Sequence, residues 1–120
     1  MNRRERGSGG EAIAWRHLES AGYRLLAKNF RSRFGEIDLV VERAGVIVFV
    51  EVRSRRGDRF GTALESVDPR KQRQIGRMAI EFLARKRLFD RSARFDVVAI
   101  EWQDGGPRID HLENAFEIGS

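Results

Sequence analysis

The chain has 120 residues, a net charge of +5 at pH 7 and a sequence isoelectric point near 10.6. Its 41% hydrophobic and 34% charged residues are typical of one soluble globular domain and exclude a disordered chain. The absence of cysteine excludes disulfides and thiolate metal sites. No apolar run reaches the roughly 18 residues that suggest a membrane span. Because residues 1–10 have no apolar stretch typical of a secretory signal, the expected location is the cytoplasm.

The basic balance suggests a polyanionic partner, most simply DNA or RNA. Two facts weaken this indication of a nucleic-acid partner. The chain carries 18 acidic residues beside its 23 basic ones, and almost all of the basic residues are arginine, which can reflect genomic base composition. Charge alone therefore points to nucleic acid without establishing it.

The first half of the chain predicts a helix followed by three strands. Residues 1–9 are polar and basic and predict a flexible arm, whereas residues 10–120 predict a single domain. A helical pattern starts at Gly10 and ends at Gly22, a natural helix C-cap. Strands are expected over residues 23–30, 36–41 and 46–53, with Ala44-Gly45 as the turn between the second and third. The third is apolar from Val46 to Val50, which predicts a central strand covered on both faces.

The second half predicts a helix and two further strands. Asp68 and Pro69 are typical of a helix start, and the apolar stripe that follows is helical in spacing. Strands are expected over residues 94–102 and 108–116, the latter at a sheet edge. A helix between two strands predicts a parallel, right-handed connection. The expected class is α/β: a mixed five-stranded sheet flanked by helices, in the order α-β-β-β-α-β-β.

Charged residues interrupt the second and third predicted strands. Asp38, Glu51 and Arg53 lie within apolar runs, where an unpaired charge costs several kcal/mol. A two-residue turn places Asp38 opposite Glu51 and Glu36 opposite Arg53, all on one face, with opposed Cβ atoms about 4.5–5.5 Å apart. A three-residue turn with a bulge would instead pair Asp38 with Val50 and separate the carboxylates, so the register stays open.

Two opposed carboxylates in a sheet repel each other unless a cation lies between them. Mg²⁺ or Mn²⁺ suits all-oxygen ligands, polarises a phosphodiester and lowers the pKa of an attacking water. Arg53 would then stabilise the charge of the transition state. Lys71 lies at the inward edge of the second helix and could reach the site, and Glu11 on the first helix could supply a third carboxylate.

Each of these assignments has a structural alternative. The carboxylates of Asp38 and Glu51 could form ion pairs with Arg53 or Lys71. Glu11 could be an acid favoured by the helix dipole, and Lys71 could be solvated. The surrounding arginines could be a solvated surface or a rim that binds phosphates; those of the rim are Arg55, Arg56, Arg59, Arg70 and Arg73. No role is assigned to His17, His111 or Asp96.

Several motifs resemble one known family. The resemblance rests on GGEAIAWRHLESAGYRLLAKNFRSRFGEIDLVV, VIVFVEVRSR, VDPRKQRQIGRMAIEFL, RFDVVAIE and HLENAF, and it covers Gly10 to Phe116. These segments resemble the YraN-like family of small bacterial proteins, which is placed in the PD-(D/E)XK nuclease superfamily, close to the archaeal Holliday junction resolvases. The resemblance implies a restriction-endonuclease-like fold and a single endonuclease-like domain.

The resemblance also implies roles for individual residues. Asp38 and Glu51 would bind the metal, with Glu11 as a nearby carboxylate, and the superfamily's Glu-x-Lys falls on Glu51 and Arg53. Arg53 departs from that pattern, and because arginine is not deprotonated in proteins it cannot act as a base. Lys71 is the candidate to take over part of the lysine's role.

Three functional hypotheses follow. The first is a metal-dependent endonuclease that hydrolyses phosphodiester bonds in DNA, including structured or branched DNA. The second is a non-catalytic nucleic-acid-binding module that retains the nuclease fold. The third is a structural or partner-binding protein whose acidic site holds no metal. A homodimer would suit a two-fold symmetric substrate, an expectation that rests on analogy.

Overall fold

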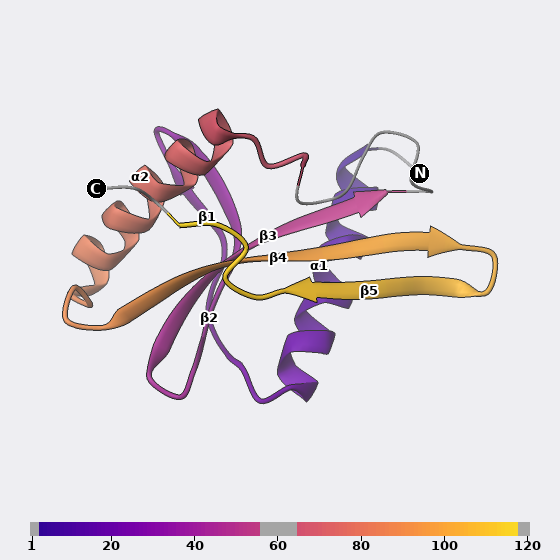
Figure 1. The fold of residues 1–120 in the computed structure, drawn as a ribbon, viewed down its shortest axis with the longest axis horizontal. Coiled ribbons are helices and arrows are strands. Elements are labelled where there is room, and N and C mark those ends of the chain that lie inside the picture. The colour runs from indigo at the N-terminus through magenta and orange to yellow at the C-terminus, as the bar shows by residue number, and fades with distance from the viewer. Residues whose placement is uncertain (1–2, 56–64, 118–120) are drawn as a thin grey trace.

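A computed structural model describes residues 3–55 and 65–117 of the chain, with side chains from residue 10 onward. Its elements follow the predicted order (Figure 1): α1 (Arg3–Ser20), β1 (Arg24–Ser32), β2 (Gly35–Arg43), β3 (Val46–Arg55), α2 (Pro69–Lys86), β4 (Ser92–Gln103) and β5 (Gly106–Leu112). Helix α1 begins at Arg3, earlier than the predicted start at Gly10. The flexible arm at residues 1–9 and the single domain after it stay predictions.

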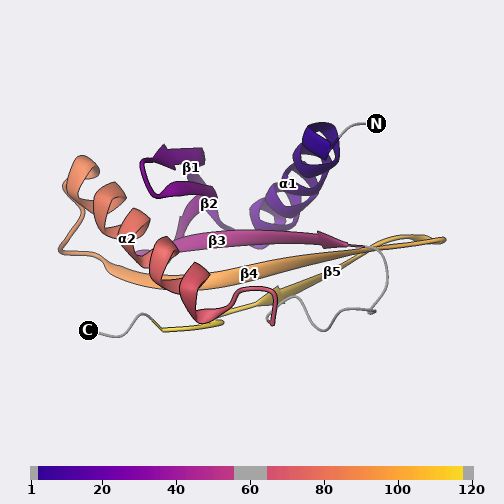
Figure 2. The same cartoon turned by 90° about the horizontal axis from the view of Figure 1, so that it is seen from above.

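The five strands form one sheet in the order β1-β2-β3-β4-β5. Neighbouring strands are antiparallel except β3 and β4, which are parallel because α2 carries the chain from the end of one to the start of the other. The prediction of a mixed α/β sheet with β3 at its centre is therefore confirmed. The β4–β5 hairpin projects past the rest of the sheet (Figures 1 and 2).

Each helix covers one face of the sheet, and β3 contributes to both layers. Ile47 and Phe49 pack in the cluster beneath α2, whereas Val48 and Val50 pack in the cluster beneath α1. This alternation follows from the two-residue period of a strand. Along the long axis of the molecule α2 lies toward one end and α1 is displaced toward the other (Figure 2). Neither of these two helices is both long and apolar enough to cross a bilayer.

Helix α2 starts and ends at clear signals. The Asp68 carboxylate accepts a hydrogen bond from the Lys71 backbone N–H at 2.9 Å, Pro69 occupies the first turn, and Arg87 closes the helix with a φ of 55°. Its buried face matches the predicted apolar stripe: Ile75, Met78, Ala79, Phe82 and Leu83. Arg70 and Arg73 are exposed on the side away from this core, whereas Lys71 is half-buried.

The β2–β3 hairpin decides the register that the sequence left open. Ala44 and Gly45 both have positive φ, 52° and 81°, which is the backbone of a two-residue type I′ turn. The strands pair from Arg43↔Val46 to Leu39↔Val50. This is the register of the two-residue turn, and the bulged alternative is excluded. The regular ladder stops at Leu39↔Val50, one residue short of Asp38 and Glu51.

Candidate metal centre

The candidate site begins at an interruption in β1 and β2. Asn29 has a φ of 53°, a left-handed conformation that is uncommon for residues other than glycine. The strands pair through Lys28↔Leu39 and Phe30↔Ile37 on either side of it. Ile37 nevertheless packs beneath α2 while Leu39 packs beneath α1, although residues two apart in a regular strand share one face. The alternation of side chains is therefore broken at this point.

Three half-buried carboxylates gather at the interruption. Glu11 from α1 and Glu36 and Asp38 from β2 each offer an oxygen, and these atoms lie within 4.8 Å of one another. The Asn29 side-chain amide donates to Glu11 at 2.9 Å and to Glu36 at 2.7 Å. The left-handed residue thus holds two of the three acids in place from β1.

Asp38 lies where β2 and β3 cease to pair. Its Oδ2 accepts a hydrogen bond from the Val52 backbone N–H at 2.8 Å. Burial, the charge of Glu51 and a hydrogen bond with Glu51 raise the pKa of Asp38 to about 8, the Glu11 charge adds to the rise, and the Val52 N–H opposes it. Near neutral pH Asp38 therefore holds a proton, which a divalent cation would have to displace.

Glu51 lies beside Asp38 but among cations. Its side chain is 6% exposed, and its Oε2 lies 3.2 Å from Arg53 Nη2 and 3.4 Å from Lys71 Nζ. The structural alternative, in which a carboxylate forms ion pairs with Arg53 and Lys71, is therefore the one observed for Glu51. It does not describe Asp38, because none of the basic side chains that the structure describes lies within ion-pair distance of it. Within the same described set, the buried Nε of Arg53 has no hydrogen-bond acceptor.

One predicted pair is wrong. Glu36 was placed opposite Arg53, but its carboxylate contacts the Asn29 amide and lies 3.4 Å from Arg31 Nε, while Arg53 pairs with Glu51. The reason is the broken alternation, which moves Glu36 toward α1. Glu36 is thereby the third acid of the cluster, with Glu11 and Asp38, and the role of Glu51 as a metal ligand stays a prediction.

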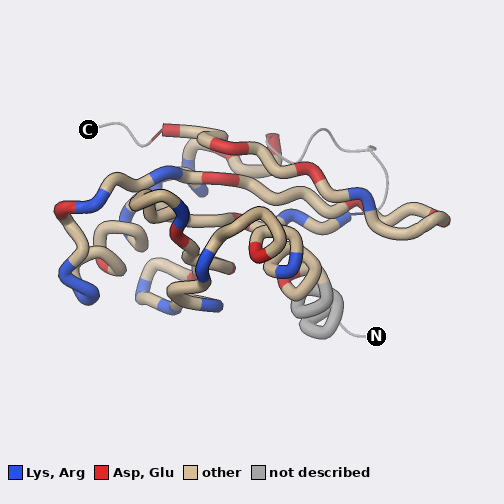
Figure 3. Tube along the Cα trace, turned by 90° about the horizontal axis from the view of Figure 1, so that it is seen from below, with Lys and Arg blue, Asp and Glu red and all other residues tan. Residues whose placement is uncertain are grey.

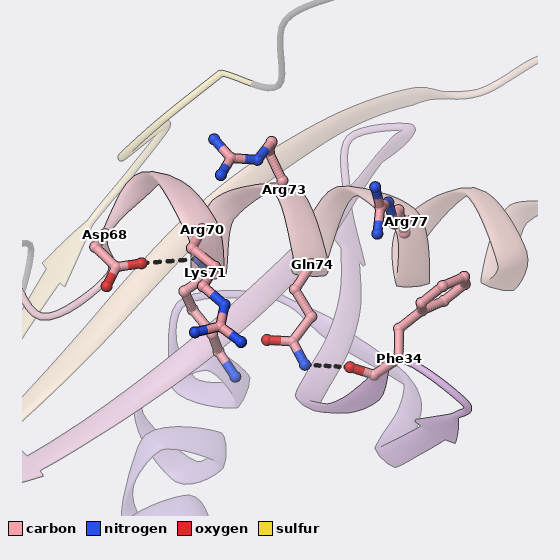
Figure 4. Close-up of a pocket in the computed structure, with 7 residues that line it drawn as sticks. All are labelled: Phe34, Asp68, Arg70, Lys71, Arg73, Gln74 and Arg77. Atoms are coloured by element: carbon pink, nitrogen blue, oxygen red, sulfur yellow. Dashed lines mark hydrogen bonds between the residues drawn. The ribbon is translucent and has the colours of Figure 1, made fainter.

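The predicted basic rim lies partly beside this site. Arg70, Lys71, Arg73 and Arg77 of α2 line a pocket of about 560 Å³ (Figure 4). Lys71 also contacts Glu51. Figure 3 shows the basic residues of the α2 region apart from the acidic residues of β5 and the segment after it. Arg55 ends β3 and is half-buried. Arg56 and Arg59 lie outside the described residues.

A second buried acid, Asp96, lies in β4, and the sequence analysis assigned no role to it. The fully buried Asp96 accepts hydrogen bonds from Arg94 at 2.9 Å and from the Asn114 backbone N–H at 3.0 Å, and it contacts His111 Nε2 at 2.7 Å. Arg94 also donates to the Tyr23 hydroxyl at 2.7 Å. Burial opposes ionisation, but the hydrogen bonds from His111, Arg94 and Asn114 outweigh it and lower the pKa of Asp96.

The donors of the acidic cluster fit a hard divalent cation, because carboxylate oxygens are the ligands that such ions prefer. A mixed five-stranded sheet with an acidic cluster between α1 and β2, and a lysine paired with the neighbouring Glu51, is the arrangement of a nuclease-like domain of the PD-(D/E)XK superfamily. The chain belongs to the family described as "Uncharacterised protein family UPF0102", whose model matches residues 10–100. The resemblance to YraN-like proteins is thereby confirmed.

Relatives of similar length support the assignment. The chain is 47% identical over 109 residues to a UPF0102 protein of Syntrophus aciditrophicus, covering 91% of this chain and 86% of that one. A UPF0102 protein of Geobacter metallireducens is 42% identical over 118 residues, covering 98% and 97% of the two chains. The solved structure of Pyrococcus furiosus SfsA in complex with Ca²⁺ is similar at a TM-score of 0.36 and 14% identity, over 98% of this chain and 66% of that chain.

Proposed function

We propose that this protein is a metal-dependent endonuclease that hydrolyses phosphodiester bonds in DNA. The observation that carries the proposal is the cluster of Glu11, Glu36 and Asp38, whose oxygens lie within 4.8 Å of one another. Crowded carboxylates repel, and burial together with the charges of Glu51 and Glu11 raises the pKa of Asp38. A bound cation turns the same crowding into a favourable interaction.

Mg²⁺ or Mn²⁺ is the cation that we propose for this cluster, because both accept carboxylate ligands together with phosphate oxygens. When bound, it supplies polarisation of the phosphodiester and a more acidic water. Glu11, Glu36 and Asp38 hold the ion, and the Asn29 amide orients two of them. Glu51 contacts Asp38 and completes the acidic wall.

The cations beside Glu51 have a separate task. Lys71 and Arg53 lie 3.4 Å and 3.2 Å from its Oε2, so both reach the edge of the acidic cluster. They are placed to stabilise negative charge that develops on a phosphate. Because Arg53 stays protonated, it provides charge and not base catalysis.

A second candidate function is a nucleic-acid-binding module without turnover. It is favoured by the same pair of contacts, because Arg53 stands where the superfamily pattern has lysine and Glu51 is neutralised by two cations. In that case the acidic cluster would hold an ion that only bridges protein and phosphate. Binding of nucleic acid would persist, and no product would form.

A melting experiment tests the metal site. The thermal midpoint of the wild-type protein is expected to rise on titration with Mn²⁺ or Mg²⁺, because an ion that binds only the folded state stabilises it. Asp38→Asn should abolish the rise. Asp104→Asn makes the same chemical change at an exposed turn and should respond like wild type. Equal responses of wild type and Asp38→Asn would sink the metal site.

A cleavage assay separates the two candidate functions. Labelled single-stranded, duplex, flap and four-way DNA, with RNA of the same sequence, would be incubated with Mn²⁺ and the wild-type protein. A metal-dependent product that disappears in Asp38→Ala and Glu51→Ala supports the endonuclease. Salt-sensitive binding without product supports the binding module.

A further inference from the structure

The basic pocket beside α2 is built from two rigid elements. The Gln74 side chain donates a hydrogen bond to the Phe34 carbonyl and so ties the β1–β2 turn to the helix (Figure 4). Gly35 permits this close approach, because it has a φ of 133° and a Cβ there would lie 2.8 Å from Gln74 Nε2. The pocket is therefore a preformed feature of the fold.

The charges around the pocket are unbalanced. Four basic side chains, Arg70, Lys71, Arg73 and Arg77, meet one carboxylate, that of Asp68, which is engaged as the helix cap. Among the described residues, Lys71 is the one of these four that forms an ion pair, through Glu51. Three exposed arginines thus remain without a carboxylate partner in the part of the chain that the structure describes. An anionic ligand would complete this surface.

The volume of the pocket and the side chains that line it restrict the class of ligand that it can bind. Its volume of about 560 Å³ is that of a pocket for one small ligand and not for a double helix. Phe34 forms one wall, with the guanidinium carbons of Arg33 and Arg77 at 4.9 Å and 5.7 Å from its ring centroid. Cations that track the backbone together with an aromatic wall are how proteins bind single-stranded nucleic acid, whereas a duplex keeps its bases stacked inside.

We propose that this pocket binds an unpaired, phosphate-bearing nucleotide of the substrate strand, so that the protein recognises nucleic acid that is single-stranded here: a free end, a flap or a melted segment. The inference rests on the proposed function for its substrate class. Lys71 links the two sites, because it lines the pocket and lies 3.4 Å from Glu51. A nucleotide in the pocket would place its neighbouring phosphodiester toward the acidic cluster.

The test is fluorescence anisotropy with one labelled DNA sequence, presented as a single strand and as a blunt duplex, in EDTA so that no hydrolysis occurs. Wild type should bind the single strand at least about tenfold more tightly. Arg73→Gln should weaken single-strand binding and reduce the slope of log affinity against log salt by about 0.7. Phe34→Leu should weaken single-strand binding by at least about fivefold and leave duplex binding unchanged.

The matched control is Lys86→Gln, which removes the same charge from an exposed position at the far end of α2. It should leave both affinities unchanged. The proposal that the pocket binds an unpaired nucleotide would be overturned if the duplex bound as tightly as the single strand. Equal losses of single-strand affinity in Arg73→Gln and Lys86→Gln would overturn it as well. Because the assay needs neither metal nor turnover, pocket-dependent binding without metal-dependent cleavage would contradict only the proposed hydrolysis. Cleavage with duplex preference would contradict only the pocket.

Discussion

Asp38 and Asp96 are both aspartates inside the sheet, yet their surroundings are opposite. Asp96 is fully buried and receives hydrogen bonds from Arg94, His111 and the Asn114 backbone. Asp38 receives one backbone hydrogen bond, from Val52, and otherwise faces other carboxylates. The pKa of Asp96 is lowered, against its burial, whereas burial and the Glu51 charge raise that of Asp38 to about 8.

The contrast separates an acid that holds the fold together from an acid that we propose binds a metal ion. Within the described chain, the Asp96 carboxylate is already surrounded by donors, so nothing further is needed to stabilise its charge. The Asp38 group lies with Glu11 and Glu36 in a cluster in which Asn29 and Arg31 contact the two glutamates, while none of the described basic side chains pairs with Asp38 itself. Burial alone would not distinguish the two aspartates. The signs of the charges on their neighbouring groups do distinguish them.

The Asp96 side of the comparison predicts a large loss of stability from a single substitution. Asp96→Asn should lower the free energy of unfolding by about 3 kcal/mol, because it leaves the Arg94 guanidinium without its charged partner. Urea denaturation measures it, with Asp104→Asn as the exposed control. A loss below about 1 kcal/mol would mean that the Asp96 group does not hold the fold together.

The dependence of the free energy of unfolding on pH should reveal the raised pKa of Asp38. Its pKa is about 8 in the folded protein against 3.8 for the free group, so the folded state holds a proton that the unfolded state has lost. In the absence of metal, its contribution to stability should therefore fall as pH rises from about 4 to about 8, by up to about 1.4 kcal/mol per pH unit. Asp96 does not contribute in this window, since its lowered pKa makes its stabilisation disappear only in more acidic solution.

Asp38→Asn isolates that slope. The difference in unfolding free energy between variant and wild type should grow in favour of the variant from pH 4 to pH 8. Denaturation curves at several pH values in EDTA provide the measurement. A constant difference across the window would show that Asp38 titrates as an ordinary aspartate.

Glu36 distinguishes a ligand cluster from a chance gathering of acids. Glu36→Gln should weaken Mn²⁺ binding by about tenfold or more while changing folding stability little, because the side chain is 37% exposed. Calorimetric titration gives the affinity. Glu19→Gln, on the exposed side of α1, should bind Mn²⁺ like wild type. Unchanged affinity in Glu36→Gln would remove Glu36 from the site.

The smallest expected effect concerns Asn29 and separates its backbone from its amide. Asn29→Gly keeps the φ of 53° without strain but loses the hydrogen bonds to Glu11 and Glu36, so stability should change by about 1 kcal/mol or less while Mn²⁺ affinity falls. Asn29→Ala should be about 1 kcal/mol less stable than Asn29→Gly, because alanine is strained at this φ. Equal stability of the two variants would contradict the left-handed conformation.

The sequence predicted the sheet well because its signals were local. The Ala44-Gly45 turn and the apolar strands on either side of it predicted the hairpin, and the two-residue turn, one of the two registers that the sequence left open, is the one observed as far as Leu39↔Val50. Asp38 and Glu51 were thereby predicted as neighbours, and they are in contact. Asp68 and Pro69 likewise marked the start of α2, which places Lys71 beside Glu51.

The rest depended on contacts between distant segments. The partner of Glu36 was predicted by extending the two-residue period of β2 past Asp38, where Ile37 and Leu39 in fact pack on different faces of the sheet. The contact of His111 with Asp96 follows from the register of β4 with β5, in which His111 pairs with Val98. A charged residue between apolar ones, as in RFDVV, was the available signal for Asp96, and it does not identify the partners.

Calorimetric titration of Mn²⁺ at pH 7, in two buffers of different ionisation enthalpy, tests the central claim most directly. If the Asp38 cluster is a metal site that holds a proton when empty, the wild-type protein should bind Mn²⁺ and release about one proton per ion, and Asp38→Asn should lose both the binding and the proton release. Failure of the wild type to bind Mn²⁺, or equal binding by Asp38→Asn, would contradict the account.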